Sequence, residues 1–247
     1  MTRLTDAFKN KKAFIPFVTA GDPDLSTTEA LIYAMGIPFS DPVAEGPVIQ
    51  EADNRALAAG FRIDALFDLL EKVREKTEIP LVFLTYANPI FTYGREAFFT
   101  RCAKASIDGV IVPDVPFEER ATLLPFAREK GIALISLIAP SSHERVQMLA
   151  REAEGYIYLV SSMGVTGVRE KITTDLKEIV EKIREVSNQP VAVGFGIARP
   201  EQAAQMADIS DGAIVGSAIV KLVAKYGKTA VGPVRDYVLS MVEAVRV

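Results

Sequence analysis

Residues 191–217 read VAVGFGIARPEQAAQMADISDGAIVGS, and this stretch decides the fold class. Two short apolar runs, Val191–Val193 and Gly212–Val215, flank Pro200–Met206, which has helical periodicity and a proline suited to a first helical turn. Apolar runs this short, without polar alternation, are typical of parallel strands covered on both faces. The stretch therefore predicts a strand–helix–strand unit of a parallel sheet.

The same alternation extends outward through the whole chain, in units of about 25 residues, and this favours a closed barrel over an open doubly wound sheet. We therefore predict a single α/β domain over residues 1–247, a (β/α)8 TIM barrel. Further strands are expected at Ala13–Thr19, Pro80–Tyr86, Gly109–Val112, Ala133–Ile138 and Tyr156–Val160. Further helices are expected at Ser26–Met35, Val48–Ala59, Ile63–Lys76, Arg95–Ala105, Glu118–Lys130, Glu144–Ala153, Thr174–Val186 and Val234–Val245.

The predicted strands number seven, one fewer than a closed barrel needs. The gap falls between the expected helix Ser26–Met35, which opens with the capping-box sequence Ser26-Thr27-Thr28-Glu29, and Gly36. An eight-stranded barrel cannot lose one strand and keep its tilt and stagger. The second strand is therefore expected to be missing, either because the barrel is altered or because the sequence lacks an internal segment.

Composition and charge narrow the possible functions. Hydrophobic residues make up 49% of the chain, enough for a large core, and the net charge of -4 with interleaved acids and bases argues against a nucleic-acid partner. One cysteine, Cys102, and one histidine, His143, exclude an internal disulfide and argue against a metal site. No stretch is apolar enough to span a membrane, and Met1–Lys12 lacks a signal-peptide core. A cytoplasmic location is therefore expected.

The run GIPFSDPVAEGP at Gly36–Pro47 predicts a shaped loop. Its three prolines and two glycines exclude a helix or an ordinary strand. It presents the carboxylates of Asp41 and Glu45, and such loops on a rigid scaffold often carry catalysis. Because the chain has one histidine, we expect carboxylates, with tyrosine, to perform the acid–base chemistry.

Glycines follow the last two predicted strands. Gly194-Phe195-Gly196 follows one strand, and Gly216-Ser217 follows the next and opens the helix-like stretch Ala218–Ala224. Backbone N–H groups at such glycines and at a helix N-terminus suit a phosphate, and barrels commonly bind one there. The alternative is that these glycines only make tight turns. A further loop, Ser161–Gly167, is interpreted as a lid or as an ordinary surface loop.

Motifs follow one another at these strand ends: Phe14–Pro23, Gly36–Gln50, Leu84–Pro89, Val112–Pro116, Gly164–Gly167, Gly194–Ile197 and Gly212–Ser217. Together they resemble the tryptophan synthase alpha chain family over nearly the whole chain. The resemblance implies a retro-aldol lyase that needs no cofactor and no metal. Its substrate would be indole-3-glycerol phosphate, cleaved to indole and glyceraldehyde 3-phosphate, and its partner a beta subunit in an alpha2beta2 assembly. The other barrel function considered, a phosphosugar isomerase, does not account for the Pro-Phe-Ser-Asp-Pro loop.

The resemblance also implies site residues. Glu45 takes the place of an aspartate that accepts the indole N–H, Thr166 would orient the loop carboxylate, and Tyr158 would contact the substrate. Taken singly, each aromatic in the expected set also fits a purely structural core position. The expected binding residues are an apolar wall of Phe17, Leu84, Tyr86, Ile138 and Phe195, and a phosphate group of Gly167, Gly196, Gly216 and Ser217.

One departure from the family bears on catalysis. In the family a glutamate ends the second strand, just before the Gly-Ile-Pro-Phe-Ser-Asp motif, and serves as acid and base at indole C3 and the glycerol hydroxyl. Here Tyr33-Ala34-Met35 precede the motif, and the chain is shorter by about ten residues, enough for a strand and its loop. Three interpretations stay open: an incomplete sequence, an inactive or misfolded deletion variant, or a barrel that only binds and activates a beta subunit.

Overall fold

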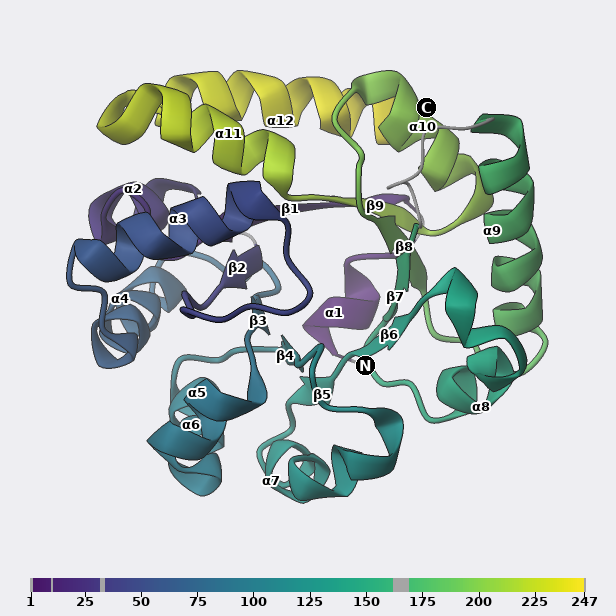
Figure 1. The fold of residues 1–247 in the computed structure, drawn as a ribbon, viewed down its shortest axis with the longest axis horizontal. Helices are drawn as coiled ribbons and strands as arrows, with labels where there is room; N and C mark the ends of the chain where they lie inside the picture. Colours follow the sequence, from purple (N-terminus) through teal and green to yellow (C-terminus); the bar gives the residue numbers. More distant parts are fainter. Residues whose placement is uncertain (1, 10, 32–33, 162–168, 247) are drawn as a thin grey trace. The chain divides into compact units, whose positions relative to one another are not determined.

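The computed structural model describes residues 2–9, 11–31, 34–161 and 169–246. In this part of the chain nine parallel strands form one sheet, in the order β5-β4-β3-β2-β1-β9-β8-β7-β6 (Figure 1). The strands are β1 (Ala13–Thr19), β2 (Ala34–Gly36), β3 (Val82–Leu84), β4 (Gly109–Ile111), β5 (Ala133–Leu134), β6 (Ser136–Ile138), β7 (Ile157–Val160), β8 (Val191–Gly194) and β9 (Gly212–Val215).

Helices connect the strands. The α-helices are α1 (Arg3–Asp6), α2 (Leu25–Leu31), α3 (Pro47–Ala58), α4 (Ile63–Arg74), α5 (Ala87–Tyr93), α6 (Arg95–Lys104), α7 (Leu124–Glu129), α8 (Val146–Arg151), α9 (Arg169–Arg184), α10 (Pro200–Ile209), α11 (Ser217–Tyr226) and α12 (Val231–Val245). Three short 3-10 helices are η1 (Phe117–Thr122), η2 (Pro140–Arg145) and η3 (Gly227–Thr229).

The chain divides into two compact units, and β1 contributes to both. Its residues Ala13–Pro16 pair with β9 in the first unit, and Phe17–Thr19 pair with β2 in the second. The first unit also holds β6, β7 and β8, and the second also holds β3, β4 and β5. The ranges are Met1–Pro16, Ile135–Gly216 and Val238–Val247 for the first unit, and Phe17–Leu134 and Ser217–Tyr237 for the second.

The strands fill eight positions along the chain. β5 ends at Leu134 and β6 begins at Ser136, so Ile135 alone separates them and they count as one strand of the repeat. β5 pairs with β4, and β6 pairs with β7, each time in parallel. Eight parallel strand positions joined by helices are the repeat of a (β/α)8 barrel, as the alternation predicted.

The expectation that the second strand is missing was wrong. Residues Ala34–Gly36 form β2, which pairs in parallel with β1 and with β3. The helix predicted to reach Met35 ends at Leu31, within the described residues. An unpaired β1 edge next to an unpaired β3 edge would leave several backbone N–H and C=O groups unsatisfied. The hydrogen bonds of the sheet therefore outweigh the helical pattern of the sequence at these positions.

The start of α2 also differs from the prediction. The expected capping box at Ser26 to Glu29 does not cap this helix; Asp24 does. Its Oδ1 accepts hydrogen bonds from the Thr27 N–H and the Ser26 hydroxyl, each at 2.8 Å. The Thr27 N–H, followed by the Ser26 hydroxyl, holds the pKa of Asp24 below its usual value. A charged carboxylate is a stronger acceptor than a serine hydroxyl for the free N–H groups of a first turn.

The predicted helix Glu118–Lys130 is interrupted. The 3-10 helix η1 ends at Thr122 and α7 begins at Leu124, with Pro125 in its first turn. Proline donates no backbone hydrogen bond and clashes with the carbonyl four residues earlier, so a continuous helix through this position is disfavoured. The apolar periodicity predicted a helical segment here but not this break.

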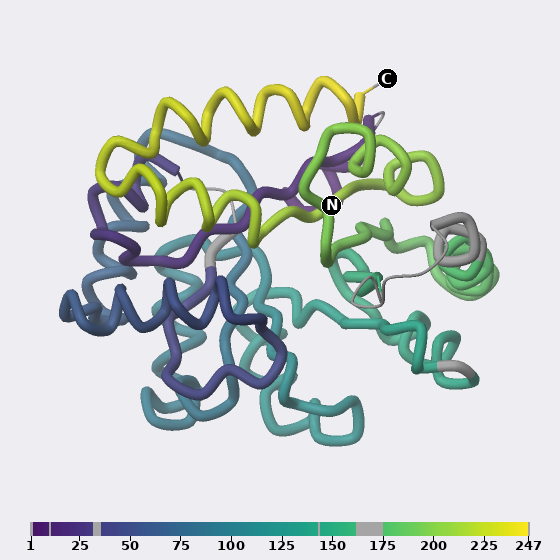
Figure 2. The backbone as a smooth tube through the Cα atoms, turned by 45° about the horizontal axis from the view of Figure 1, so that its top comes forward, coloured from purple at the N-terminus to yellow at the C-terminus, as the bar shows by residue number. Residues whose placement is uncertain are grey.

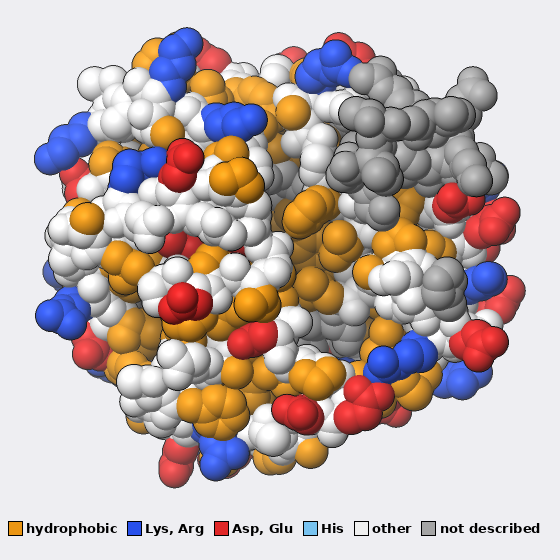
Figure 3. Space-filling view, viewed as in Figure 1, with side chains coloured by type: hydrophobic (Ala, Val, Ile, Leu, Met, Phe, Trp, Pro, Cys, Tyr) orange, Lys and Arg blue, Asp and Glu red, His pale blue; other side chains and the backbone are white. Residues whose placement is uncertain are grey.

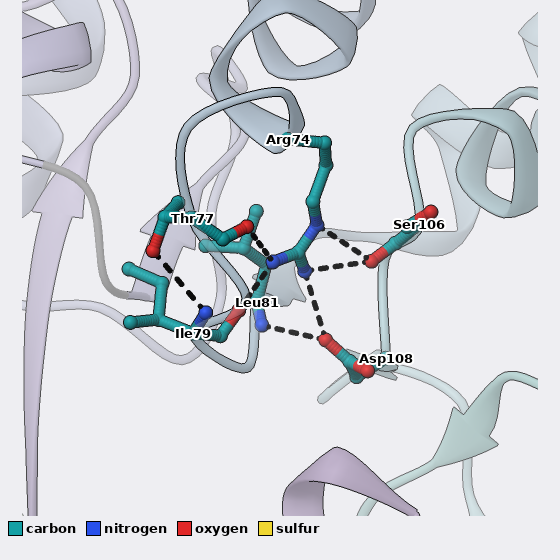
Figure 4. A network of polar contacts seen from close by, with 6 residues as sticks. All are labelled: Arg74, Thr77, Ile79, Leu81, Ser106 and Asp108. Carbon is teal, nitrogen blue, oxygen red and sulfur yellow. Dashed lines mark hydrogen bonds and ion pairs between the residues drawn. The ribbon is translucent and has the colours of Figure 1, made fainter.

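A polar cluster fastens α4 to the segments that enter β3 and β4 (Figure 4). The guanidinium of Arg74 donates to the Ser106 carbonyl at 2.7 Å and to Asp108 Oδ2 at 3.0 Å, and it also donates to the Ile79 carbonyl. Asp108 Oδ2 in turn accepts the Leu81 N–H at 2.8 Å. This cluster precedes the strands, whereas barrel active sites lie where strands end. Its role is therefore structural.

Candidate functional site

The loop between β2 and α3 carries the first predicted catalytic residue, Glu45. The loop ends at Gly46, whose extended backbone precedes Pro47 at the start of α3. Proline suits this position because its fixed φ matches a helix and its missing N–H has no helical partner there. The Gln50 side chain reaches back from α3 and donates to the Glu45 carbonyl at 2.8 Å. Glu45 is thus held against the first turn of a helix.

Asp53 of α3 meets the Glu45 side chain in the interior. Only 3% of Asp53 is exposed, and its carboxyl group interacts with that of Glu45. Burial, followed by the Glu45 charge, raises the pKa of Asp53 to about 8, against a smaller opposing effect of the Phe39 backbone N–H. Burial likewise raises the pKa of Glu45. The two carboxyl groups therefore form an acidic pair whose full ionisation is disfavoured.

Tyr86 completes this cluster. It is 1% exposed, its hydroxyl accepts the Ala44 N–H at 3.3 Å, and its side chain interacts electrostatically with Glu45. Its ring packs against Phe39 with the centroids 5.3 Å apart. Burial raises the pKa of Tyr86, and the Glu45 charge adds to this. The sequence predicted Tyr86 in an apolar wall. Its ring is buried, and its hydroxyl also binds the backbone of the Gly36–Pro47 loop.

Phe17 and Leu84 of the expected apolar wall pack in one cluster, which also contains Ile49 and Ala52 of α3 and Val220 of α11. α3 and α11 lie side by side (Figure 2). Asp53 follows Ala52 among the buried residues of α3, so this acid and part of the apolar cluster lie on one helix. The second unit thus brings Phe17, Leu84, Glu45 and Tyr86 onto neighbouring elements.

Ser217 of the expected phosphate group begins α11 and is exposed, directly after the half-buried Gly216. The first N–H groups of a helix have no partner within the helix and carry the positive end of its dipole. Ser217 adds a hydroxyl to them. This end of α11 is suited to bind an anion.

The first unit places Tyr158 on β7 beside Gly194 on β8. A Cβ at position 194 would lie 2.6 Å from the Tyr158 hydroxyl oxygen, so this glycine makes room for the ring. Ser161, at the end of β7, donates its hydroxyl to the Gly194 carbonyl at 3.0 Å and the Phe195 carbonyl at 2.7 Å. Ile138 ends β6 and is fully buried.

Phe195 has an unusual backbone conformation. Its φ is +93°, a region that residues other than glycine rarely adopt, and Gly196 follows with φ +76°. The side chain is nevertheless 48% exposed, so packing of the ring does not explain the strain. Strained residues of this kind gather at binding sites. The loop therefore remains a strong candidate for ligand contact.

The structure leaves some predicted residues untested and adds one that was not predicted. Thr166, Gly167 and most of the expected lid lie outside the described residues. Asp53 was missed, although the sequence held a signal: it occupies the same helical stripe as Ile49, Ala52 and Ala56, where an acid is out of place. The second-strand glutamate has no counterpart on β2, because Ala34 and Met35 carry no carboxyl group.

Other kinds of site find no support in the described residues. They contain no group of histidine, cysteine or acidic side chains that could hold a metal ion, and none of their helices is long and apolar enough to cross a membrane. On the face shown in Figure 3, acidic and basic side chains are interspersed. A continuous basic surface, as nucleic-acid binding needs, is not formed on that face.

Comparison with known proteins gives a consistent result. The family described as tryptophan synthase alpha chain matches residues 4–243. The tryptophan synthase alpha chain of Lacticaseibacillus casei is 48% identical, with 96% of this chain and 93% of that protein covered. That of Caldanaerobacter subterraneus subsp. tengcongensis is 44% identical, with 95% and 94% covered.

Solved structures agree. Tryptophan synthase subunit alpha from Legionella pneumophila superposes with a TM-score of 0.89 at 32% identity, covering 99% of this chain and 98% of that one. A chain from the tryptophan synthase a2b2 complex of Pyrococcus furiosus superposes with a TM-score of 0.86 at 34% identity, covering 94% and 99%. These similarities confirm the predicted TIM-barrel fold.

Proposed function

Because the chain belongs to the tryptophan synthase alpha chain family, we propose that it cleaves indole-3-glycerol phosphate to indole and glyceraldehyde 3-phosphate, a retro-aldol lyase reaction of tryptophan biosynthesis. The observation that carries this proposal is the Glu45 carboxyl group, whose Oε2 is buried and which lies just before α3, the helix that supplies Ile49 and Ala52 to an apolar cluster. A carboxylate next to an apolar surface suits an indole ring, which is apolar except for one N–H donor.

Glu45 would accept the indole N–H. Cleavage requires a proton at indole C3, after which the bond to the glycerol carbon breaks and the ring takes its electrons. Positive charge develops on the ring nitrogen while C3 is protonated, and a carboxylate at the N–H stabilises it. Loss of the glycerol hydroxyl proton then gives the aldehyde. No step of this reaction needs an external cofactor.

By resemblance, the remaining predicted residues would contact the indole end and the phosphate end of the substrate. Phe17 and Leu84, with Ile138 and Phe195, would contact the ring, and Tyr158 would contact the substrate from β7. The phosphate would bind the N-terminus of α11 through Gly216 and Ser217, with Gly196 from the preceding loop. By resemblance, Gly167 and Thr166 would complete the phosphate contacts and orient Glu45.

We also propose that the chain associates with a tryptophan synthase beta subunit. The related Pyrococcus furiosus chain belongs to an a2b2 complex. Channelling of indole to such a partner would keep this apolar product out of bulk water. The expected assembly is therefore alpha2beta2.

A second candidate function rests on β2. Position 34 is in register with Phe17 on β1 and with Val82 on β3. By resemblance, an acid–base glutamate would end the second strand, but neither Ala34 nor Met35 supplies an acid or a base. This favours a barrel that binds the substrate and activates a beta subunit without fast cleavage.

Three variants separate these functions when indole release is followed with the beta subunit present. Glu45→Gln removes the carboxylate and is expected to lower kcat/KM by about 100-fold or more. Glu51→Gln, an exposed acid on the same helix, is the matched control and is expected to leave it unchanged. If only Ala34→Glu releases indole, the unmodified chain is the non-catalytic activator.

A further inference from the structure

Asp53 is a buried acid that the proposed reaction does not use. It lies on α3 with 3% exposure, whereas Glu45 lies in the preceding loop. Their carboxyl groups interact although they come from different elements. A carboxylate only accepts hydrogen bonds, so a bond between two carboxyl groups requires a proton on one of them.

The Glu45 side chain shows where that proton is needed. Its Oε2 is buried and has no hydrogen-bond partner in the part of the chain that the structure describes. A buried acceptor without a donor costs about 1–3 kcal/mol. A proton on the adjoining Asp53 carboxyl supplies the donor and removes one of two like charges at the same time.

The neighbouring charged groups do not neutralise the pair. Asp22 faces Asp53 and adds a repulsive charge. Arg55 is the adjacent cation, but it makes a two-point contact with Asp22, Nε to Oδ1 at 2.9 Å and Nη2 to Oδ2 at 2.8 Å. The Tyr86 hydroxyl and Asp114 supply no cation: Tyr86 interacts with Glu45, and the Asp114 charge acts on Tyr86. Retention of a proton is therefore the way in which this cluster balances its charge.

We propose that Asp53 is a positioning residue, which holds one proton shared with Glu45 and thereby fixes the Glu45 carboxylate for the indole N–H. Asp53 is protonated and Glu45 is ionised in the working state. This inference rests on the proposed function of Glu45 and adds a residue to it. The pKa of Asp53, raised to about 8 by burial and by Glu45, agrees with this state near neutral pH.

The first test measures the proton directly. Carboxyl ¹³C resonances of the unmodified protein are followed from pH 4 to pH 10 and compared with those of Asp53→Asn and Glu51→Gln. We expect one carboxyl to titrate near pH 8, to vanish in Asp53→Asn and to persist in the control. Titration of Asp53 at an ordinary aspartate pKa would overturn the inference, whether or not the protein releases indole.

The second test measures positioning by ligand binding, so that it does not depend on cleavage. The probe is an indole with a three-carbon chain that ends in phosphate and lacks the hydroxyl groups. Asp53→Asn keeps an N–H donor and is expected to bind the probe within about threefold of the unmodified protein. Asp53→Ala is expected to weaken binding about 10- to 100-fold.

The pH dependence of binding separates positioning from a merely structural role. For the unmodified protein, affinity should fall above about pH 8, when Asp53 ionises and repels Glu45, and this fall should be absent in Asp53→Asn. Equal affinity of Asp53→Ala and the unmodified protein at every pH would overturn the inference. A probe that binds as expected without any indole release would instead contradict the proposed cleavage alone.

Discussion

The ring of Tyr158 on β7 occupies the space that a side chain at position 194 on β8 would need: a Cβ on Gly194 would lie 2.6 Å from Tyr158 Cε2 and from its hydroxyl oxygen. The second unit repeats this arrangement, since a Cβ on Gly36 would lie 2.6 Å from Phe17 Cζ. Each glycine ends a strand that pairs with the strand carrying an expected substrate-contacting ring. Each ring therefore depends on its neighbouring glycine for space, Tyr158 on Gly194 and Phe17 on Gly36.

Gly194→Ala is predicted to displace the Tyr158 ring. Overpacking of this kind should lower the free energy of unfolding by about 1–3 kcal/mol, measured by urea denaturation. The double variant Gly194→Ala, Tyr158→Ala should recover part of that loss, because the clashing ring is gone. Gly232→Ala is the control, since a Cβ there meets no atom within 4 Å. If Gly194→Ala were as stable as the unmodified protein, the Tyr158 ring would be able to move aside without cost, which would contradict the prediction.

The stability of the protein is predicted to depend on pH through Asp53. Its pKa is about 8 in the folded protein and 3.8 without the surrounding structure. Between these values the folded state holds a proton that the unfolded chain has lost. The free energy of unfolding should therefore fall as pH rises through this window, by up to about 1.4 kcal/mol per pH unit. Denaturation of Asp53→Asn should show a smaller slope; an equal slope would contradict the assignment.

Arg74→Ala is predicted to be strongly destabilising. The side chains of Arg74 and Asp108 are 8% and 7% exposed, and removal of one partner leaves the other charge buried. A loss of about 3–5 kcal/mol is expected in the free energy of unfolding. Lys76→Ala removes a solvent-exposed ion pair with Glu29 and should cost less than about 1 kcal/mol. Comparable losses in the free energy of unfolding for the two variants would show that the buried Arg74 cluster contributes no more to stability than an exposed ion pair.

Ser217→Asp is predicted to have opposite effects on stability and on substrate binding. An acid at the start of α11 interacts favourably with the helix dipole, so the free energy of unfolding should stay level or rise by about 0.3–1 kcal/mol. The same charge should repel the phosphate and raise KM by about tenfold or more. Ser217→Asn keeps the size without the charge. An unchanged KM in Ser217→Asp would place the phosphate elsewhere.

Sequence patterns predicted most strands of this protein because strands such as Val191–Gly194 and Gly212–Val215 are fully buried. Such segments need unbroken apolar runs, which are visible without any structure. β2 could not be found in this way. Ala34-Met35-Gly36 has no strand pattern, and its conformation follows from the strands on either side of it.

The candidate site was predicted in part. Glu45 stood out because its loop contains residues that no regular element tolerates. Asp53 did not, because its importance depends on its interaction with Glu45, and the sequence does not show how the loop before α3 folds back toward that helix. The capping carboxylate of Asp24 was missed for a similar reason: a local pattern at Ser26 fitted equally well, and only the geometry of the turn decides between them.

The most direct test of the proposed function is the release of indole from indole-3-glycerol phosphate by the unmodified chain, measured with and without a beta subunit and matched to the glyceraldehyde 3-phosphate formed. We predict equal amounts of the two products, at a rate that Glu45→Gln lowers by about 100-fold or more. Absence of both products under either condition, from a folded protein that binds the indole phosphate probe, would contradict cleavage and establish the non-catalytic activator in its place.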